Sequence, residues 1–300
     1  MNFKELNSRE KRIIEEKGTE EPFSGEYENF YAEGTYLCRR CGALLYRSTD
    51  KFDAHCGWPS FDDAVLGAVK RMPDADGRRT EIICRRCGAH LGHVFEGEEL
   101  TAKNTRHCVN SLSLEFLSAT QEAKGPREAY FAGGCFWCTE AAFKMVKGVK
   151  EVLSGYAGGR TPSPTYEEVN SQKTGHAETV KVTYDPREIS FEGLLDIFFA
   201  MHDPTTPNRQ GADVGSQYRS IIFYQDELQR EIIEKYIAEL EKEKVFAAPI
   251  VTEVIPFHAF YEAENHHQDY FAKNPEAAYC QAVINPKLAK LRKKLAAYLQ

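Results

Sequence analysis

The spacing of apolar and polar residues changes character near the middle of the chain. In the first half no long helical period appears, and short alternating runs bounded by turn residues predict strands at residues 34–38, 79–84 and 111–116. One short helix is expected before them, over residues 8–17, beginning near Ser8 and ending before Gly18. The first half is therefore predicted to be an all-β domain.

The second half alternates strand-like with helix-like segments. Strands are predicted at residues 128–132, 178–184, 219–224 and 250–255. Ser190 and Asp226 are expected to cap helices, because their side chains accept hydrogen bonds from free backbone N–H groups. Apolar residues at helical spacing follow each cap and also mark a basic terminal helix: Leu194, Leu195, Phe198 and Phe199; Leu228, Ile232, Ile233, Tyr236, Ile237 and Leu240; Leu288, Leu291, Leu295 and Leu299. The alternation predicts an α/β domain, in the form of an α+β two-layer sandwich.

A polar stretch with a Gly-Pro break separates the strand-rich first half from the second half. Residues 118–127 are mostly small or polar and contain Gly125 and Pro126, which is typical of a linker. A chain of 300 residues is long enough for two domains with separate cores. We therefore expect a domain at residues 1–117, a linker at 118–127 and a second domain at 128–300.

Composition and charge narrow the class of protein. The chain is 42% hydrophobic and 28% charged, as in globular proteins, and its net charge of −7 argues against nucleic acid or an acidic membrane as the main partner. Neither an apolar run that could span a bilayer nor the apolar core of a signal peptide is found. We expect a cytoplasmic protein, in which nine cysteines serve metal binding or redox chemistry rather than a disulfide framework.

Two Cys-Arg-Arg-Cys-Gly-Ala motifs in the first half have the spacing of zinc knuckles. They supply four thiolates, which close a tetrahedral shell and leave no position for a substrate, so one structural zinc is predicted. The alternative is a pair of unrelated redox motifs. The four predicted ligands are Cys38, Cys41, Cys84 and Cys87.

Three further motifs in this half contain Cys56, Cys108 and two histidines. They read His-Cys-Gly-Trp-Pro-Ser-Phe, His-Leu-Gly-His-Val-Phe and Cys-Val-Asn-Ser-Leu-Ser-Leu. Arg106 and His107 precede Cys108 and are expected to lower the pKa of its thiol. Taken alone, the histidines would be ordinary core residues with satisfied hydrogen bonds.

With these motifs in this order, residues 18–116 resemble the B type of peptide methionine sulfoxide reductase. The resemblance implies that Cys108 is the nucleophile and Cys56 the resolving thiol. It also implies that Trp58 packs on the substrate methyl group, while further side chains position and protonate the sulfoxide oxygen: His90, His93 and Asn110. One departure is visible, because the family commonly has tyrosine where this chain has His107.

The second half opens on Gly-Gly-Cys135-Phe-Trp-Cys138, where an apolar strand runs into a glycine turn. Helical spacing follows until Gly148, so Cys135 is expected at the start of a helix, where free N–H groups and the helix dipole favour a thiolate. Phe136 and Trp137 would place an apolar wall beside the sulfur. The alternative is a buried structural cysteine behind an aromatic pair.

Further motifs continue the series: Ser-Gly-Tyr-Ala-Gly-Gly at 154–159, Thr-Gly-His-Ala-Glu at 174–178 and Gly-Ala-Asp-Val-Gly-Ser-Gln-Tyr-Arg at 211–219. Residues 128 to about 285 thus resemble the A type of methionine sulfoxide reductase. The resemblance implies that Phe136 and Trp137 cage the substrate methyl group. A sulfoxide oxygen leaves only when protonated, and a buried Glu178 would carry that proton. Hydrogen bonds to the oxygen and support of the polar network would come from Tyr166, Tyr218 and Asp213. Without the motifs, the tyrosines would be taken as packing residues with satisfied hydroxyls.

Attack on the sulfoxide would leave a sulfenic acid on Cys135, which condenses with a second thiol. We favour Cys280 as that thiol, since its surrounding motif matches the family and a tail can move. Cys138, three residues from Cys135, is the other candidate. A metal site at residues 262–267 is disfavoured, because Glu262, Glu264, His266 and His267 are expected on a solvated helix face.

The resemblances together imply a bifunctional repair enzyme. The C-terminal domain would reduce the S epimer of methionine sulfoxide and the N-terminal domain the R epimer, in oxidised proteins or in the free amino acid. Thioredoxin would recycle both disulfides, with no organic cofactor, nucleic acid or membrane involved. The alternative is a general dithiol–disulfide oxidoreductase with an attached structural zinc-binding module.

Overall fold

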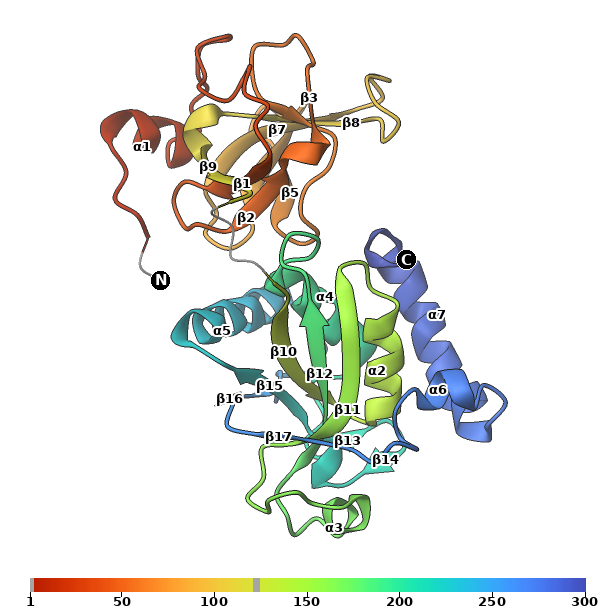
Figure 1. The fold of residues 1–300 in the computed structure, drawn as a ribbon. Helices are drawn as coiled ribbons and strands as arrows, with labels where there is room; N and C mark the ends of the chain where they lie inside the picture. Colours follow the sequence, from red (N-terminus) through yellow and green to blue (C-terminus); the bar gives the residue numbers. More distant parts are fainter. Residues whose placement is uncertain (1–2, 121–124) are drawn as a thin grey trace. The chain divides into compact units, whose positions relative to one another are not determined.

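The computed structural model describes residues 3–120 and 125–300. The chain divides into two compact units, Met1–Gly125 with Pro186–Gly193 and Pro126–Asp185 with Leu194–Gln300 (Figure 1). The predicted linker, residues 118–127, includes residues 121–124, which lie outside the described part, so its bounds stay a prediction. No helix within the described ranges combines the length and apolar character needed to cross a bilayer.

The first unit is built from antiparallel strands. One sheet has three strands in the order β2-β1-β9, and the other has six in the order β3-β4-β8-β7-β6-β5. The strands are β1 (Gly34–Cys38), β2 (Leu44–Arg47), β3 (Lys51–Phe52), β4 (Ser60–Phe61), β5 (Val69–Pro73), β6 (Thr80–Cys84), β7 (His90–Glu96), β8 (Thr105–Val109) and β9 (Leu114–Ser118). The predicted strand at 111–116 was partly wrong, because residues Ser111–Ser113 form a 3-10 turn ahead of β9.

The expected N-terminal helix is present as α1 (Ser8–Ile14), so the unit is mainly but not purely β. Its cap is Asn7, whose side chain accepts hydrogen bonds from the backbone N–H groups of Arg9 and Glu10. The Glu10 carboxylate accepts in return from the Asn7 N–H, which completes a capping box. Two free N–H groups are thus satisfied, and the helix begins one residue after its cap.

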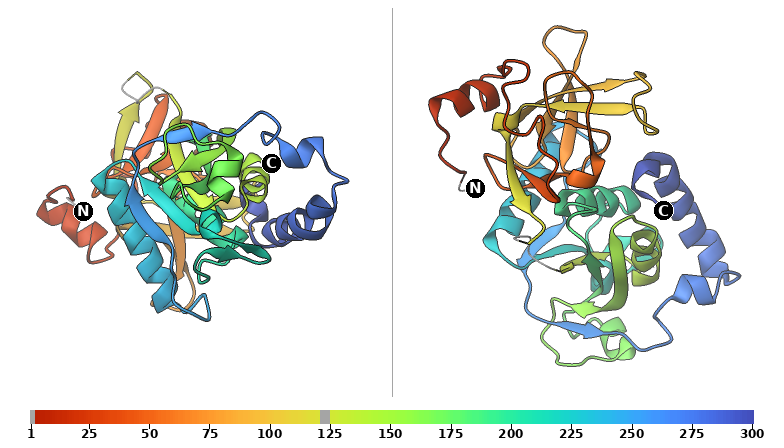
Figure 2. Two further views of the ribbon diagram at one scale, coloured as in Figure 1. Left: turned by 90° about the horizontal axis from the view of Figure 1, so that it is seen from below. Right: turned by 45° about the horizontal axis from the view of Figure 1, so that its top comes forward.

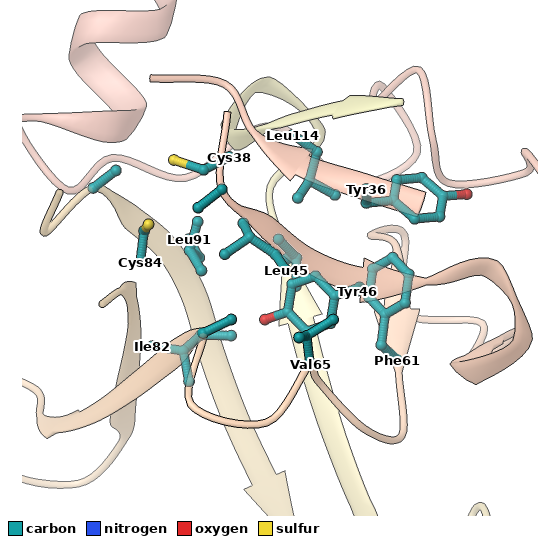
Figure 3. Packing of buried hydrophobic residues seen from close by; sticks show 14 of the residues in the cluster. Tyr36, Cys38, Leu45, Tyr46, Phe61, Val65, Ile82, Cys84, Leu91 and Leu114 are labelled. Atoms are coloured by element: carbon teal, nitrogen blue, oxygen red, sulfur yellow. The ribbon is translucent and has the colours of Figure 1, made fainter. Parts of the chain in front are cut away.

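Alternation along the strands fills one hydrophobic core in this unit. Figure 3 shows the aromatic rings of Tyr36, Tyr46 and Phe61 gathered with the aliphatic side chains around them. The Tyr46 and Phe61 rings stack with centroids 4.4 Å apart. Two cysteines of the predicted zinc knuckles, Cys38 and Cys84, lie at one edge of this same cluster (Figure 3), so the core holds the β strands that carry them.

The second unit has one mixed six-stranded sheet in the order β16-β15-β10-β12-β11-β17, in which only β15 and β16 pair in parallel. Its strands are β10 (Arg127–Gly133), β11 (Val149–Ala157), β12 (Ala177–Tyr184), β15 (Ser220–Tyr224), β16 (Glu253–Pro256) and β17 (Phe260–Glu262), with a separate hairpin of β13 (Arg209–Gln210) and β14 (Asp213–Val214). Its helices are α2 (Phe136–Lys144), α3 (Tyr166–Asn170), α4 (Phe191–Met201), α5 (Glu227–Lys242), α6 (Tyr270–Lys273) and α7 (Asn285–Lys294).

The central strand β10 separates two apolar layers, because successive side chains point to opposite faces. On one face Phe131 stacks with Phe143 of α2 and Phe198 of α4. On the other, the Tyr130 ring stacks on Phe257 with centroids 3.9 Å apart. Helix α7, drawn in blue in Figure 2, runs alongside α2, drawn in yellow-green. The side chains of Leu288 and Leu291 on α7 are buried. The sheet with helices packed on it agrees with the predicted second half.

The predicted helix caps in this unit are confirmed. Asp226 accepts a hydrogen bond from the Gln229 N–H at the start of α5, and Ser190 accepts from the Gly193 N–H at the start of α4. The predicted apolar face of α5 was wrong at Leu228, which is 46% exposed. Leu228 lies in the first turn of α5, ahead of the buried Ile232, Ile233 and Tyr236. The terminal helix α7 ends at Lys294, short of the predicted end.

Candidate active sites

The two Cys-Arg-Arg-Cys-Gly-Ala motifs fold into matching knuckles. In the first, the Cys38 N–H donates to the Ala43 carbonyl, and the Gly42 N–H donates to the Cys38 carbonyl. Cys84, Gly88 and Ala89 repeat this pattern in the second knuckle. Both glycines have φ near +70° to +75°, a conformation that disfavours other residues. The same local sequence therefore builds the same turn twice.

The knuckles bring four sulfurs together. The distance from Cys38 Sγ to Cys87 Sγ is 3.6 Å, as is that from Cys41 Sγ to Cys84 Sγ, and all four atoms lie within 4.8 Å of one another. Tetrahedral zinc with bonds of about 2.3 Å requires sulfur separations of roughly 3.8 Å. This cysteine cluster therefore fits a zinc ion in size and in the softness of its ligands.

Strand register places Cys108 beside one of the predicted histidines. Cys108 of β8 faces His93 of β7 on one side and Ser60 of β4 on the other. Residues directly opposite in antiparallel strands share a face of the sheet. The three side chains thus form a row, although their positions in the sequence are far apart.

A bulge at Gly92 turns His90 toward the same side, so that the two imidazole rings lie 5.7 Å apart. Gly92 has φ of +152°, and a side chain there would meet the Cys108 carbonyl oxygen at 2.1 Å. Two carboxylates hold the rings: Glu81 lies 2.7 Å from His90 Nδ1 and Asp74 lies 2.8 Å from His93 Nε2. Each imidazole is therefore fixed in orientation by a carboxylate partner.

A cavity of about 100 Å³ opens at this row. Four of the predicted residues line it, namely Trp58, His93, Cys108 and Asn110. Glu20, which the sequence did not single out, holds two of them. Its carbonyl accepts from Trp58 Nε1 at 3.1 Å, and its N–H donates to Asn110 Oδ1 at 3.0 Å. The backbone of one residue in the N-terminal segment thus fixes both the indole and the amide.

The two thiols of this site form a pair, with Cys56 Sγ 3.9 Å from Cys108 Sγ. The hydrogen bond from Cys108 lowers the pKa of Cys56 to about 5 and raises the pKa of Cys108. Arg106 lowers the pKa of Cys108 as expected, but the hydrogen bond to Cys56 and burial outweigh it, so the net shift is upward. His107 points to the opposite face of β8, where it contacts the Tyr46 hydroxyl, and burial lowers the pKa of His107 to about 4. It is neutral near pH 7.

In the second unit, Cys135 lies directly before α2 and is 6% exposed. The next residue, Phe136, donates its N–H to Glu178 Oε2 at 2.9 Å, so the carboxyl group occupies the N-terminus of this helix. Burial raises the pKa of Glu178 to about 8. A carboxyl that keeps its proton at neutral pH thus lies beside the thiol.

The predicted polar residues converge on the same place. Glu178 and Cys135 both act electrostatically on Tyr166 and Tyr218, and burial raises the pKa of each phenol. Asp213 on β14 accepts a hydrogen bond of 2.7 Å from the Tyr279 hydroxyl, which lies 3.9 Å from Cys138 Sγ. The polar side chains predicted from the sequence therefore surround the thiols of this site, and Tyr279 joins them.

Aromatic rings wall this site. Phe136 is buried, and Trp137 stacks on Tyr270 with centroids 3.5 Å apart. His267 packs 4.4 Å from the Tyr166 ring and 5.2 Å from that of Phe136. The expected solvated helix face at residues 262–267 was wrong, because Glu262 ends β17, turns follow it, and His267 is 3% exposed.

Cys135 and Cys138 form a second hydrogen-bonded thiol pair. Burial, with Cys138 nearby, raises the pKa of Cys135, whereas the hydrogen bond from Cys135 lowers the pKa of Cys138 to about 7. The pKa of Cys135 is thus raised, opposite to the direction expected from its place at the start of a helix. Cys280 opens the π-helical turn Cys280–Ile284 and is fully buried. Burial raises its pKa, and Cys138 contributes.

Sequence reasoning missed the residues that hold others in place. They have ordinary types, and their partners are distant in the chain: Glu20, Asp74, Glu81, His267 and Tyr279. Tyr279 alone carried a signal, because it directly precedes Cys280 in the motif around that cysteine.

Comparison with known proteins agrees with this organisation. Residues 127–299 match the family model described as peptide methionine sulfoxide reductase, and residues 6–118 match the SelR domain. The chain is 54% identical over 173 residues to the peptide methionine sulfoxide reductase MsrA of Chromobacterium violaceum, which covers 58% of this chain and 98% of that protein. For the protein of the same name from Sulfolobus acidocaldarius the identity is 56% over 165 residues, with coverage of 55% and 93%. The reduced form of Mxr1 from Saccharomyces cerevisiae is 34% identical, with a TM-score of 0.48, and covers 53% of this chain and 91% of that chain.

Each unit thus contains two neighbouring thiols with titratable side chains near them, an arrangement typical of an oxidoreductase. The chain belongs to the peptide methionine sulfoxide reductase family, with a B-type domain followed by an A-type domain. These domains indicate both methionine-R-oxide and methionine-S-oxide reductase activity.

Proposed function

We propose that the C-terminal domain reduces the S epimer of methionine sulfoxide and the N-terminal domain the R epimer. The observation that carries this proposal is the neutral carboxyl of Glu178 beside Cys135. A thiolate attacks a sulfoxide productively only if the oxygen is protonated as it leaves the sulfur, and a buried carboxylic acid supplies that proton. Phe136 and Trp137 form the apolar contact for the methyl group, and Tyr166 and Tyr218 bind the oxygen.

The thiol pair supplies the electrons. Cys135 passes its proton to Cys138 and attacks the sulfoxide sulfur. The oxygen is transferred, so that methionine and a Cys135 sulfenic acid result. Cys138 then attacks Cys135 Sγ, the S–O bond breaks, and the departing hydroxide takes a proton to become water. The contact between Cys135 and Cys138 favours this first disulfide, after which Cys280 exchanges with Cys138 and frees Cys135.

In the N-terminal domain Cys108 has the role of Cys135 and Cys56 that of Cys138. Trp58 contacts the methyl group, while His90, His93 and Asn110 hold and protonate the oxygen. The cavity that joins Cys108 to Trp58, His93 and Asn110 supports this assignment. One structural zinc bound by Cys38, Cys41, Cys84 and Cys87 fixes the two knuckles. It supplies cross-linking of the β strands and no chemistry of the reaction.

A dithiol protein of low reduction potential must return both disulfides to thiols. Thioredoxin has this chemistry and is the proposed reductant. Oxidised proteins and free methionine sulfoxide are the proposed substrates, and a reducing cytoplasm is the proposed location.

Separate assays of the two epimers test the division of labour. Cys135→Ser is expected to abolish turnover of the S epimer and to leave the R epimer unaffected, because the thiols of the other domain are intact. Cys108→Ser is expected to do the reverse. Mass spectrometry of methionine formed from each pure epimer measures both. Loss of both activities in either single variant would contradict the proposal.

A further inference from the structure

The C-terminal helix brings a cation to the second thiol of the A-type site. Lys287 lies in the first turn of α7, and its Nζ donates to Cys138 Sγ at 3.6 Å. Cys138 itself is buried in the first turn of α2. An ammonium group at hydrogen-bond distance stabilises a buried thiolate, since the charge would otherwise be costly away from water.

Packing fixes this contact along the helices. Leu288 and Leu291 of α7 are buried, and at the far end Arg292 contacts Met145, just beyond α2. The two helices therefore run side by side with their N-termini together. Because Lys287 is adjacent to buried Leu288, its position is set by the apolar face of α7.

We propose that Lys287 is the residue that activates Cys138 as the thiol that resolves the Cys135 sulfenic acid. This inference rests on the proposed function of the A-type site. In the resolving step the ammonium group holds Cys138 as a thiolate while the new S–S bond forms. Before this step Cys138 gives the proton that it took from Cys135 to Glu178, which had lost its own proton to the sulfoxide oxygen. Glu178 then donates that proton to the hydroxide that leaves Cys135, and water forms. Lys287 keeps its own proton throughout, so it stabilises the Cys138 thiolate without donating or accepting a proton.

Other groups around Cys138 set the background for this effect. The Tyr279 hydroxyl also contacts the sulfur, while Asp213 opposes its negative charge. The titratable groups that act on it or feel its charge are Cys135, Glu178, Asp213, Tyr279, Cys280 and Lys287. Lys287 is the cation among them, so its removal shifts the thiol in a defined direction: the Cys138 pKa rises.

The test measures Cys138 directly. In the full-length Cys135→Ser protein, alkylation of Cys138 by iodoacetamide is followed against pH by peptide mass spectrometry. Lys287→Met is expected to raise the midpoint by about one pH unit, and Lys287→Arg is expected to restore it. Lys293→Met, the same change at an exposed position of the same helix, serves as the control. Equal midpoints for Lys287→Met and Lys293→Met would overturn the inference. Thermal unfolding verifies that each variant is folded.

A second measurement uses proteins that retain Cys135. After mixing with one equivalent of the S epimer, Lys287→Met is expected to accumulate Cys135 sulfenic acid, trapped with a cyclic 1,3-diketone, and to form the Cys135–Cys138 disulfide about tenfold more slowly relative to methionine. Methionine formation with an unchanged rate of disulfide formation would overturn the role of Lys287 alone. If the unmodified protein formed neither methionine nor sulfenic acid, the proposed function itself would be overturned. The alkylation experiment needs no substrate, so its result does not depend on the proposed function.

Discussion

The two thiol sites differ in how far apart their parts lie along the chain and in how deeply they are buried. In the N-terminal domain, Cys56 lies in the loop between β3 and β4, whereas Cys108 lies on β8 and lines a cavity together with His93. In the C-terminal domain, Cys135 and Cys138 share one turn of a helix, and the nearby acid is a buried carboxyl. In each pair the hydrogen bond between the sulfurs lowers the pKa of one thiol, Cys56 in the first site and Cys138 in the second.

Burial alone does not decide which side chain can carry the proton. Glu178 is buried, and burial raises its pKa to about 8. Glu81 in the N-terminal site is equally buried, and although burial raises its pKa, hydrogen bonds with Lys17 and His90 lower it, so that this carboxylate holds an imidazole instead. The same proposed reaction thus has two solutions, which differ in the partners of the buried carboxyl group.

The largest expected effect concerns the zinc ion proposed for the N-terminal domain. Removal of zinc with a strong chelator under reducing conditions is expected to abolish R-epimer turnover, because the two knuckles lose their cross-link and the β strands separate. S-epimer turnover in the same sample is the internal control and is expected to persist. Epimer-specific assays with measurement of bound zinc test this. Full R-epimer activity after verified metal loss would contradict a structural role.

The proton donor of the buried site is tested by Glu178→Gln. We expect S-epimer turnover to fall by about 10² to 10⁴, because an amide cannot deliver a proton to the leaving oxygen. Glu140→Gln is the matched control: Glu140 is also buried with a raised pKa, but its partners are Lys144 and the Asp269 N–H. Its S-epimer turnover should be retained.

Glu178→Gln, compared with Cys138→Ser, also distinguishes the proposed reductase from a general dithiol oxidoreductase. That alternative needs both thiols of Cys135-Phe-Trp-Cys138 but no acid, so Cys138→Ser would abolish activity and Glu178→Gln would have little effect. Near-normal turnover of the S epimer by Glu178→Gln would therefore favour it.

The smallest expected effect is in the pH profiles. Glu178 is active while protonated, and its raised pKa keeps the proton up to about pH 8. S-epimer turnover should thus fall about tenfold per pH unit above that value. Burial lowers the pKa of His90, so its imidazole is already neutral at pH 7 and does not change its protonation between pH 7 and 9. The ratio of S- to R-epimer rates should decline from pH 7 to 9. A constant ratio would show that Glu178 does not limit the reaction.

Much of the architecture followed from local patterns. The caps at Ser190 and Asp226 and the strand at 34–38 could be predicted, because each depends on neighbours within a few residues. The bounds of β9 could not, since the turn at Ser111–Ser113 depends on contacts made by distant residues. Its Ser111 hydroxyl accepts from the Tyr27 N–H.

The sequence predicted which residues form the candidate sites, but not which thiol of each pair has the lower pKa. The family motifs contain Cys108 in one unit and Cys135 with Glu178 in the other, and within each unit the structure places most of the expected neighbours around them. Which sulfur carries the charge depends on burial and on the partner thiol, neither of which spacing reveals. Side chains alternate along a strand, so His107 lies on the face of β8 opposite to Cys108. The sequence pattern alone therefore indicates that the imidazole does not face this thiol.

The backbone of Glu20 ties an unstructured arm to the reaction chemistry. Its carbonyl and N–H fix Trp58 and Asn110 from outside the six-stranded sheet. A protein that lacked this segment would lose both hydrogen bonds, so its indole and amide would be free to turn, and it would also lose Tyr27 from the core. The segment that orients the proposed substrate contacts is thus also part of what holds the domain together.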